Sequence, residues 1–302
     1  MICRLPNIQR SPALLLLLLI GVSGSVFARP NMTPLGPNIA DKGSAFYHFT
    51  LNEFDSADGQ RHYKVWTGVP DKAPPSSGYR VVYLLDGNAV MDKLEEPLLQ
   101  KISAVNPPVL VVVGYQTALP FDVNARTYDY TPPDAEHGEA GYTFSRGRKG
   151  GGSTAFRSLL EQRIAPVAEK GLHINRQQRA LWGHSYGGLF VLDSYLHSAF
   201  FTRYYATSPS IGQGFFSLLN EMKVQESRHG GGIQLTLMEG NGDRRSDRNT
   251  AEPEVLSAVH STVNTMAEHG LDARYQLFPG LTHGQMFGAS LADALTQISI
   301  TP

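Results

Sequence analysis

Short, nearly continuous apolar segments alternate along this chain with stretches in which apolar residues recur at helical spacing. The apolar segments, which we interpret as buried strands, are 80–85, 109–113, 179–182 and 233–238, and residues 273–278 are expected to form the last strand. The stretches with helical spacing are 155–168, 189–196 and 253–269. Because strands that are apolar on both faces must be covered on both faces, this order predicts an α/β fold with a mainly parallel central sheet and helices on both sides.

The rest of the pattern favours one domain. The chain has 302 residues, of which 41% are apolar, and this is enough for a sizeable core. Residues 47–66 suit a strand pair with a turn at 55–59. We see no internal repeat and no long linker, so residues 29–302 are expected to form a single domain.

The first 28 residues have the layout of a secretory signal. Arg4 and Arg10 precede an apolar run at 13–20, and short side chains at Val26 and Ala28 suit a cleavage site. The apolar run is shorter than the about 20 residues that a membrane-spanning helix needs. An uncleaved N-terminal anchor is the alternative. We therefore expect residues 1–28 to be a cleaved signal peptide and the remainder to be exported to a bacterial periplasm.

Charge and cysteine content exclude other classes of protein. The chain has 26 Lys and Arg against 27 Asp and Glu, a formal net charge of −1, which argues against a nucleic-acid partner. Cys3 is the single cysteine, and it lies in the signal segment. A disulfide framework and a cysteine-ligated zinc site are therefore excluded. The histidines show no convincing metal-ligand spacing, so we expect no metal site and no cofactor.

Residues 181–189 carry the strongest chemical signal. Gly183-His184-Ser185-Tyr186-Gly187 is a Gly-x-Ser-x-Gly motif between an apolar strand and a helical stretch. In this context the serine sits on a sharp strand-to-helix turn, and glycine on both flanks is expected to prevent Cβ clashes. Ser185 is therefore the predicted nucleophile, with a purely structural turn as the alternative. His184 is expected to be a packing residue, because a base must approach from across the pocket.

A serine nucleophile needs a base, and in the fold that this motif indicates the chain order is serine, acid, histidine. His283 follows a predicted strand and precedes a glycine, and we predict that it is the general base. Asp243 is the leading candidate for the acid, with Glu239 and Asp247 as alternatives. A Ser–His dyad, in which a backbone carbonyl orients the imidazole, stays open.

Two backbone amides are expected to stabilise the oxyanion. Tyr186 begins the helix after the nucleophile, and Asn88 lies in the loop after the strand 80–85. The glycine-rich stretch 138–154 carries Arg146, Arg148 and Lys149 and is either a flexible surface loop or part of the substrate site. It is not a phosphate-binding loop, because serine stands where that motif requires lysine.

Six segments carry a resemblance to a known family. They are 83–88, 126–132, 151–157, 183–190, 208–210 and 281–284. On these segments the chain resembles the esterase-D branch of the α/β-hydrolases, and within it the periplasmic enterobactin (catecholate trilactone siderophore) esterases. The resemblance implies the α/β-hydrolase fold and hydrolysis of the trilactone esters to release iron. It also implies that Ser185 is the nucleophile, that His283 is the base and that Arg126 lies close to the site.

The sequence departs from the wider branch in two places. Ser210 is followed by Ile211 and Gly212 where many relatives have tryptophan, and no acid stands out after Met238. The siderophore-esterase subgroup shares both features, and the second favours a dyad.

The implied substrate suits the basic residues of the chain. Ferric catecholates are anionic, so the candidate substrate-binding residues are Arg126, Arg146, Arg148 and Lys149. The iron belongs to the substrate, and contact with iron-uptake membrane proteins is left open. The alternatives are a general periplasmic carboxylesterase or acyl-transfer enzyme, and a non-catalytic siderophore-binding protein.

Overall fold

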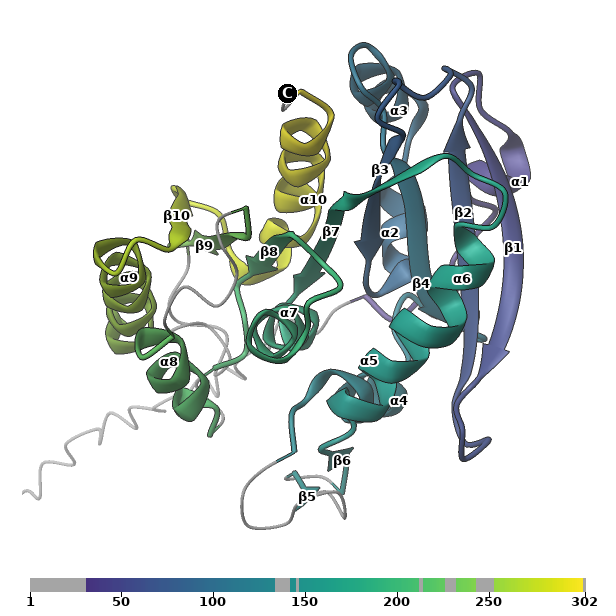
Figure 1. The fold of residues 1–302 in the computed structure, drawn as a ribbon. Coiled ribbons are helices and arrows are strands. Elements are labelled where there is room, and N and C mark those ends of the chain that lie inside the picture. The colour runs from purple at the N-terminus through teal and green to yellow at the C-terminus, as the bar shows by residue number, and fades with distance from the viewer. Residues whose placement is uncertain are drawn as a thin grey trace, which may run out of the picture.

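The computed structural model describes residues 31–133, 142–144, 147–211, 214–225, 232–242 and 253–300. Its main sheet has eight strands in the order β1-β2-β4-β3-β7-β8-β9-β10 (Figure 1). These strands are β1 Tyr47–Asp55, β2 His62–Pro70, β3 Tyr79–Leu84, β4 Val109–Tyr115, β7 Ile174–His184, β8 Arg203–Thr207, β9 Gln234–Gly240 and β10 Asp272–Phe278. A separate two-stranded sheet pairs β5 Tyr142–Thr143 with β6 Lys149–Gly150.

The main sheet is mostly parallel. The β1–β2 and β2–β4 pairs are antiparallel, and every pair from β4 through β3, β7, β8 and β9 to β10 is parallel. Strands β3, β4 and the second half of β7 are buried on both faces, which explains their continuous apolar sequences. The predicted α/β class with a mainly parallel sheet is therefore confirmed.

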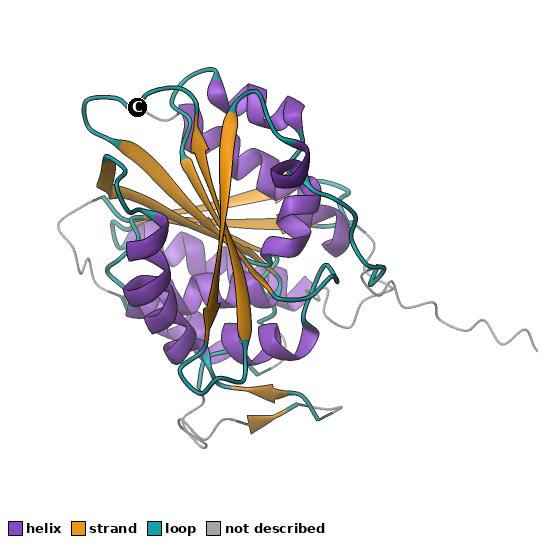
Figure 2. Cartoon of the chain, turned by 90° about the vertical axis from the view of Figure 1, so that its right-hand side faces the viewer, coloured by secondary structure: helices purple, strands orange, loops and turns teal. Residues whose placement is uncertain are grey.

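Helices cover both faces of the sheet (Figure 2). Their bounds are α1 Ile39–Lys42, α2 Gly87–Lys93, α3 Glu96–Ser103, α4 Val123–Tyr130, α5 Ser153–Leu159, the π-helix Leu160–Ile164, α6 Ala165–Ala168, α7 Tyr186–His197, α8 Phe216–Lys223, α9 Pro253–Glu268 and α10 His283–Ile300. Side chains of α1, α2, α3 and α10 share one buried cluster with one face of the sheet. Side chains of α4 to α9 share the cluster on the other face.

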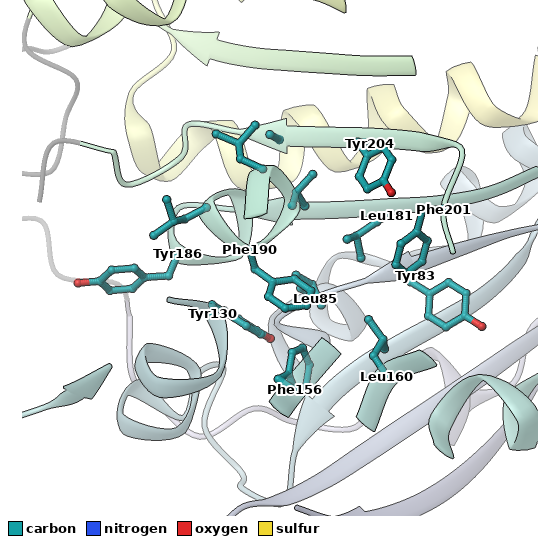
Figure 3. Close-up of a cluster of buried hydrophobic side chains, with 14 of the residues drawn as sticks. Tyr83, Leu85, Tyr130, Phe156, Leu160, Leu181, Tyr186, Phe190, Phe201 and Tyr204 are labelled. Carbon is teal, nitrogen blue, oxygen red and sulfur yellow. The ribbon is translucent and has the colours of Figure 1, made fainter. Parts of the chain in front are cut away.

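Successive residues of a strand contribute side chains to these two clusters in turn. Val81 and Tyr83 of β3 point into the cluster beside α7, whereas Val82 and Leu84 point into the cluster beside α10. Figure 3 shows part of the first cluster, where Phe190 of α7 lies among Leu85, Tyr130 and Phe156. Tyr186 lies at the edge of this group, so the first turn of α7 is anchored by buried aromatic contacts.

The structure differs from the sequence prediction in three elements. Strand β8 has only five residues, and neither it nor α10 was predicted. The helix predicted over 155–168 is divided by a π-helical turn, in which the Ala165 amide donates to the Leu160 carbonyl five residues back. Pro166 explains the division, because it has no amide hydrogen with which to continue regular α-helical bonding.

No helix in the described part of the chain has the length and apolar character needed to cross a membrane. The predicted signal peptide, residues 1–28, lies outside the described residues.

Candidate active site

Ser185 occupies a sharp turn between β7 and α7. Its backbone has φ 60° and ψ −117°, which is a strained conformation for a residue with a side chain. Two backbone hydrogen bonds hold the turn: the Ser185 amide donates to the Thr207 carbonyl at 2.9 Å, and the Leu189 amide donates to the Ser185 carbonyl at 3.0 Å. This is the strand-turn-helix geometry that presents a nucleophilic hydroxyl.

The glycines around Ser185 are not equivalent. A Cβ on Gly183 would lie 2.4 Å from the Gly187 carbonyl oxygen, and a Cβ on Gly188 would lie 2.6 Å from the Thr207 carbonyl oxygen. A Cβ on Gly187 would come no closer than 3.5 Å to its neighbours, which is an ordinary contact. The expectation that both flanking glycines prevent clashes is therefore right for Gly183 and wrong for Gly187.

Ser210 contacts the candidate nucleophile directly. The two hydroxyl oxygens of Ser185 and Ser210 lie 3.0 Å apart, and the Ser210 amide donates to the Ser185 carbonyl at 3.2 Å. Ser210 is buried, so its hydroxyl has a restricted set of orientations. From the sequence, Ser210 was predicted only as part of a segment shared with the family. Its contact with Ser185 was not predicted, because β8, the strand that precedes it, was itself not predicted.

Arg126 lies beside the turn but is engaged by a carboxylate. Its Nε and Nη2 donate to the two oxygens of Asp86 at 2.7 and 2.8 Å, and Nη2 lies 3.4 Å from the His184 carbonyl oxygen. Burial acts to lower the pKa of Arg126, but the charge of Asp86 and the hydrogen bonds to it, together with Tyr130 and Tyr115, outweigh burial and leave that pKa raised. The guanidinium is therefore a fixed cation next to the candidate nucleophile.

Asp86 was missed as a site residue, although it follows an apolar strand directly. It has φ 56°, and its backbone amide donates a hydrogen bond to the Tyr130 hydroxyl oxygen at 3.1 Å. The left-handed backbone turns the chain sharply from β3 into α2. An acidic residue at the carboxyl end of a buried parallel strand was the available signal, because ligands and reactive groups gather at that edge.

The two expected oxyanion donors lie in the first turns of helices. Asn88 is the second residue of α2 and Tyr186 the first residue of α7, positions whose amides have no acceptor within the helix. The Asn88 side chain is used elsewhere: Nδ2 donates to the carbonyls of Tyr115 and Thr117, and Oδ1 accepts from the Tyr115 amide. These three bonds fix α2 against the end of β4.

His283 is the first residue of α10. Thr282 and Gln285 form a capping pair around it, since the Thr282 amide donates to Gln285 Oε1 at 2.9 Å. The preceding loop is tied to the end of β9: the Gly242 amide donates to the Leu281 carbonyl at 2.8 Å. The His283 ring lies 4.5 Å, centroid to centroid, from that of His184, the residue before Ser185. The candidate base and nucleophile thus come from different elements that meet at this point.

The acid cannot be placed in the same way, because Asp243 and Asp247 lie outside the described residues. Glu239, the remaining alternative, is buried near the end of β9 and hydrogen-bonds to the Ser208 side chain. Burial raises the pKa of Glu239 to about 8. Ser208 lies two residues before Ser210, so Glu239 contacts the segment that carries the neighbour of Ser185.

Of the three basic residues predicted in the glycine-rich stretch, Arg146 lies outside the described residues. Arg148 is partly buried, and its charge acts on Tyr186: burial raises the pKa of Tyr186, while Arg148 and Arg126 oppose the rise. Phe144 packs on Tyr186 with ring centroids 6.0 Å apart. The described part of the stretch is therefore not a plain surface loop, since Phe144, directly after β5, packs on Tyr186, the residue after the candidate nucleophile. Lys149, on β6, is exposed.

A search of the described residues finds no group of three or more His, Cys, Asp or Glu side chains that could hold a metal ion.

Comparison with known proteins places this geometry in a family. The Esterase family model matches residues 56–298. The chain belongs to the Esterase family. It is 52% identical over 277 residues to the apo-salmochelin esterase of Escherichia coli O6:H1, a match that covers 92% of this chain and 87% of the relative. It is 35% identical over 249 residues to the ferri-bacillibactin esterase BesA of Bacillus subtilis, covering 80% and 86% of the two chains.

A solved structure also resembles this esterase in both fold and sequence. The structure of the enterobactin hydrolase IroE in complex with DFP matches with a TM-score of 0.78 and 51% identity, covering 88% of this chain and 100% of that chain. DFP is a reagent for serine hydrolases, which use a serine nucleophile. The predicted enzyme class, a carboxylic ester hydrolase of the serine type, is confirmed.

Proposed function

We propose that this esterase hydrolyses the ester bonds of a ferric catecholate trilactone siderophore of the enterobactin type. The observation that carries the proposal is the strained Ser185 turn, with the Arg126 cation near the His184 carbonyl oxygen and the His283 ring of α10 beside the His184 ring. Relatives that share most of their length with this chain are siderophore esterases by name, which favours the same substrate class.

In the proposed reaction His283 accepts the Ser185 proton as the hydroxyl oxygen attacks a serine-ester carbonyl. The amides of Asn88 and Tyr186 stabilise the oxyanion. Collapse of the tetrahedral intermediate breaks the ester C–O bond, and His283 gives its proton to the leaving alcohol. Water then attacks the acyl-enzyme with the same base and releases the acid. Asp243 is the proposed acid of a triad with these residues, and a Ser–His dyad is the alternative.

Substrate recognition is proposed to rest on charge and on aromatic surface. Catecholate oxygens are anionic, and Arg126, Arg148 and Lys149 are the proposed cations; Arg126 lies over the Tyr186 ring, and the charge of Arg148 also acts on Tyr186. Arg126 is held by Asp86, so it acts as a fixed charge, whereas Lys149 is exposed and Arg148 is partly exposed. Arg146 belongs to the same proposed set. Iron enters as part of the substrate, and no protein cofactor is required.

The proposed compartment is the periplasm, which the signal layout of residues 1–28 supports. Lack of cysteine beyond Cys3 makes the exported chain indifferent to an oxidising environment.

Product analysis tests the substrate. Purified protein that lacks residues 1–28 is incubated with iron-loaded and with iron-free enterobactin, and the products are identified by mass. We expect linear trimer, dimer and monomer with the wild type and none with Ser185→Ala. Absence of cleavage of both forms, together with fast hydrolysis of p-nitrophenyl acetate, would replace the siderophore substrate with a general carboxylesterase activity.

A further inference from the structure

His184 joins the two candidate catalytic residues. It is the last residue of β7, directly before Ser185 in the chain, and it is buried. Its Nε2 lies 2.9 Å from the backbone carbonyl oxygen of His283. Since a carbonyl oxygen only accepts hydrogen bonds, Nε2 must carry a hydrogen and donate it.

The surroundings keep His184 neutral. Burial, followed by the charges of His283 and Arg126, lowers the pKa of His184 well below its ordinary value. A neutral imidazole has a single N–H, and the bond to His283 places that hydrogen on Nε2. His184 is therefore a poor competitor for the Ser185 proton, which leaves that task to His283.

The ring of His184 also has little freedom to move. It lies 4.5 Å from the His283 ring at an interplanar angle of 46°, and it meets the edge of Phe287 at 5.5 Å. Phe287 belongs to α10, and it packs against Trp182 of β7 at 5.2 Å. The first turn of α10 is thus fixed to the end of β7 by one hydrogen bond and three ring contacts.

We propose that His184 is a positioning residue that sets the place of His283 relative to Ser185. It is the residue before Ser185 in the chain, and its side chain is hydrogen-bonded to the main chain of His283. It therefore connects the backbone of the nucleophile to the backbone of the base. Because its carbonyl oxygen faces Arg126, it also ties the fixed cation to the same point. The expectation that His184 merely packs is therefore incomplete. This inference rests on the proposed role of His283 as base.

A pair of variants tests the hydrogen bond. His184→Leu fills the site without an N–H donor, and His184→Gln retains one. With p-nitrophenyl acetate we expect kcat to fall about 10- to 100-fold in His184→Leu, because a small misplacement of a catalytic group has that effect, with KM nearly unchanged. The His184→Gln variant should recover most of the loss. Unchanged kcat in a folded His184→Leu, or equal losses in both variants, would overturn the inference.

Nuclear magnetic resonance of the wild type tests it without any substitution. With ¹⁵N-labelled histidine, His184 should appear as a neutral ring protonated on Nε2, and it should stay neutral below the pH at which free histidine titrates. A ring protonated on Nδ1 alone, or one that titrates near the ordinary value, would contradict the inference.

The same assay separates this inference from the proposed function. Loss of activity in His283→Ala with full activity in His184→Leu would remove the positioning role alone. Full activity in His283→Ala would remove the proposed base, and the inference would fall with it.

Discussion

The Ser185 and Ser210 hydroxyl oxygens lie 3.0 Å apart, at the point where β7 and the segment after β8 meet. A second bond, from the Ser210 amide to the Ser185 carbonyl at 3.2 Å, fixes the distance between the two residues. The hydroxyl of a serine can rotate freely, so a fixed neighbour reduces the orientations open to the nucleophile. The structure thus suggests that Ser210 orients Ser185 before substrate arrives.

Replacing Ser210 by alanine removes this neighbour but keeps the main-chain bond. We expect kcat to fall about fivefold, because one hydrogen bond contributes about 1 kcal/mol, with little change in KM. Steady-state kinetics with p-nitrophenyl acetate, alongside circular dichroism to verify folding, measures the effect. A folded Ser210→Ala enzyme with wild-type kcat would show that the contact has no part in catalysis.

The Arg126–Asp86 pair is expected to be strongly coupled. Asp86 is buried and the Arg126 side chain is only 11% exposed, so removing one partner leaves an uncompensated charge, at a cost of about 3–5 kcal/mol. Asp86→Asn and Arg126→Met should each lower the free energy of unfolding, and the double variant should lose less than the two losses combined. Urea unfolding of the four proteins measures the coupling. Strictly additive losses would show that the ion pair does not stabilise the fold.

Gly183 and Gly187 offer a matched comparison. Gly183→Ala would bring a Cβ within 2.4 Å of the Gly187 carbonyl oxygen, so the turn at Ser185 must distort and activity should be lost. Gly187→Ala meets nothing closer than 3.5 Å and should keep near wild-type activity. Reaction rates with a fluorophosphonate report on the turn itself. An active Gly183→Ala enzyme would mean that the close approach of these backbones is not required.

Glu239 should make stability depend on pH. In the unfolded chain its carboxyl releases a proton near the ordinary pKa of 4.5, whereas the folded protein retains it until about pH 8. A raised carboxyl pKa means that stability is lost as the pH rises between those values, by at most about 1.4 kcal/mol per pH unit. Glu239→Gln should remove that part of the slope.

Urea unfolding between pH 5 and 8 compares the two slopes. Asp129, whose pKa burial raises to about 7, contributes with the same sign in both proteins, so the difference isolates Glu239. Equal slopes for the wild type and Glu239→Gln would show that Glu239 does not hold its proton in the folded state.

The parallel strands and the motif around Ser185 could be predicted from the sequence because both are local patterns. Strands β3, β4 and the second half of β7 have apolar residues at consecutive positions, and the motif around Ser185 is contiguous. Contacts between segments that are far apart in the sequence could not be predicted. Asp86 and Arg126 are 40 residues apart and meet only after β3, α2 and α4 are placed. The sequence also did not show that a Cβ would clash at Gly183 and not at Gly187, because this depends on which backbone atoms lie next to each Cα.

His184 illustrates the same limit. Its residue type and its place in the motif were known, but its partner, the His283 carbonyl, is 99 residues away. Nothing in the local sequence distinguishes a histidine that packs from one that donates a hydrogen bond to the candidate base. The roles of Asp243 and Arg146 remain predictions, because both residues lie outside the described part of the chain.

The central claim is that Ser185 is the nucleophile in siderophore ester hydrolysis. The most direct measurement is inactivation by di-isopropyl fluorophosphate, followed by peptide mass mapping and assay with enterobactin. The account predicts one di-isopropylphosphoryl group, bound to Ser185 Oγ with loss of fluoride, and loss of enterobactin hydrolysis in proportion to labelling. Hydrolysis that persists in fully labelled protein, or inactivation with the label on another residue, would contradict it.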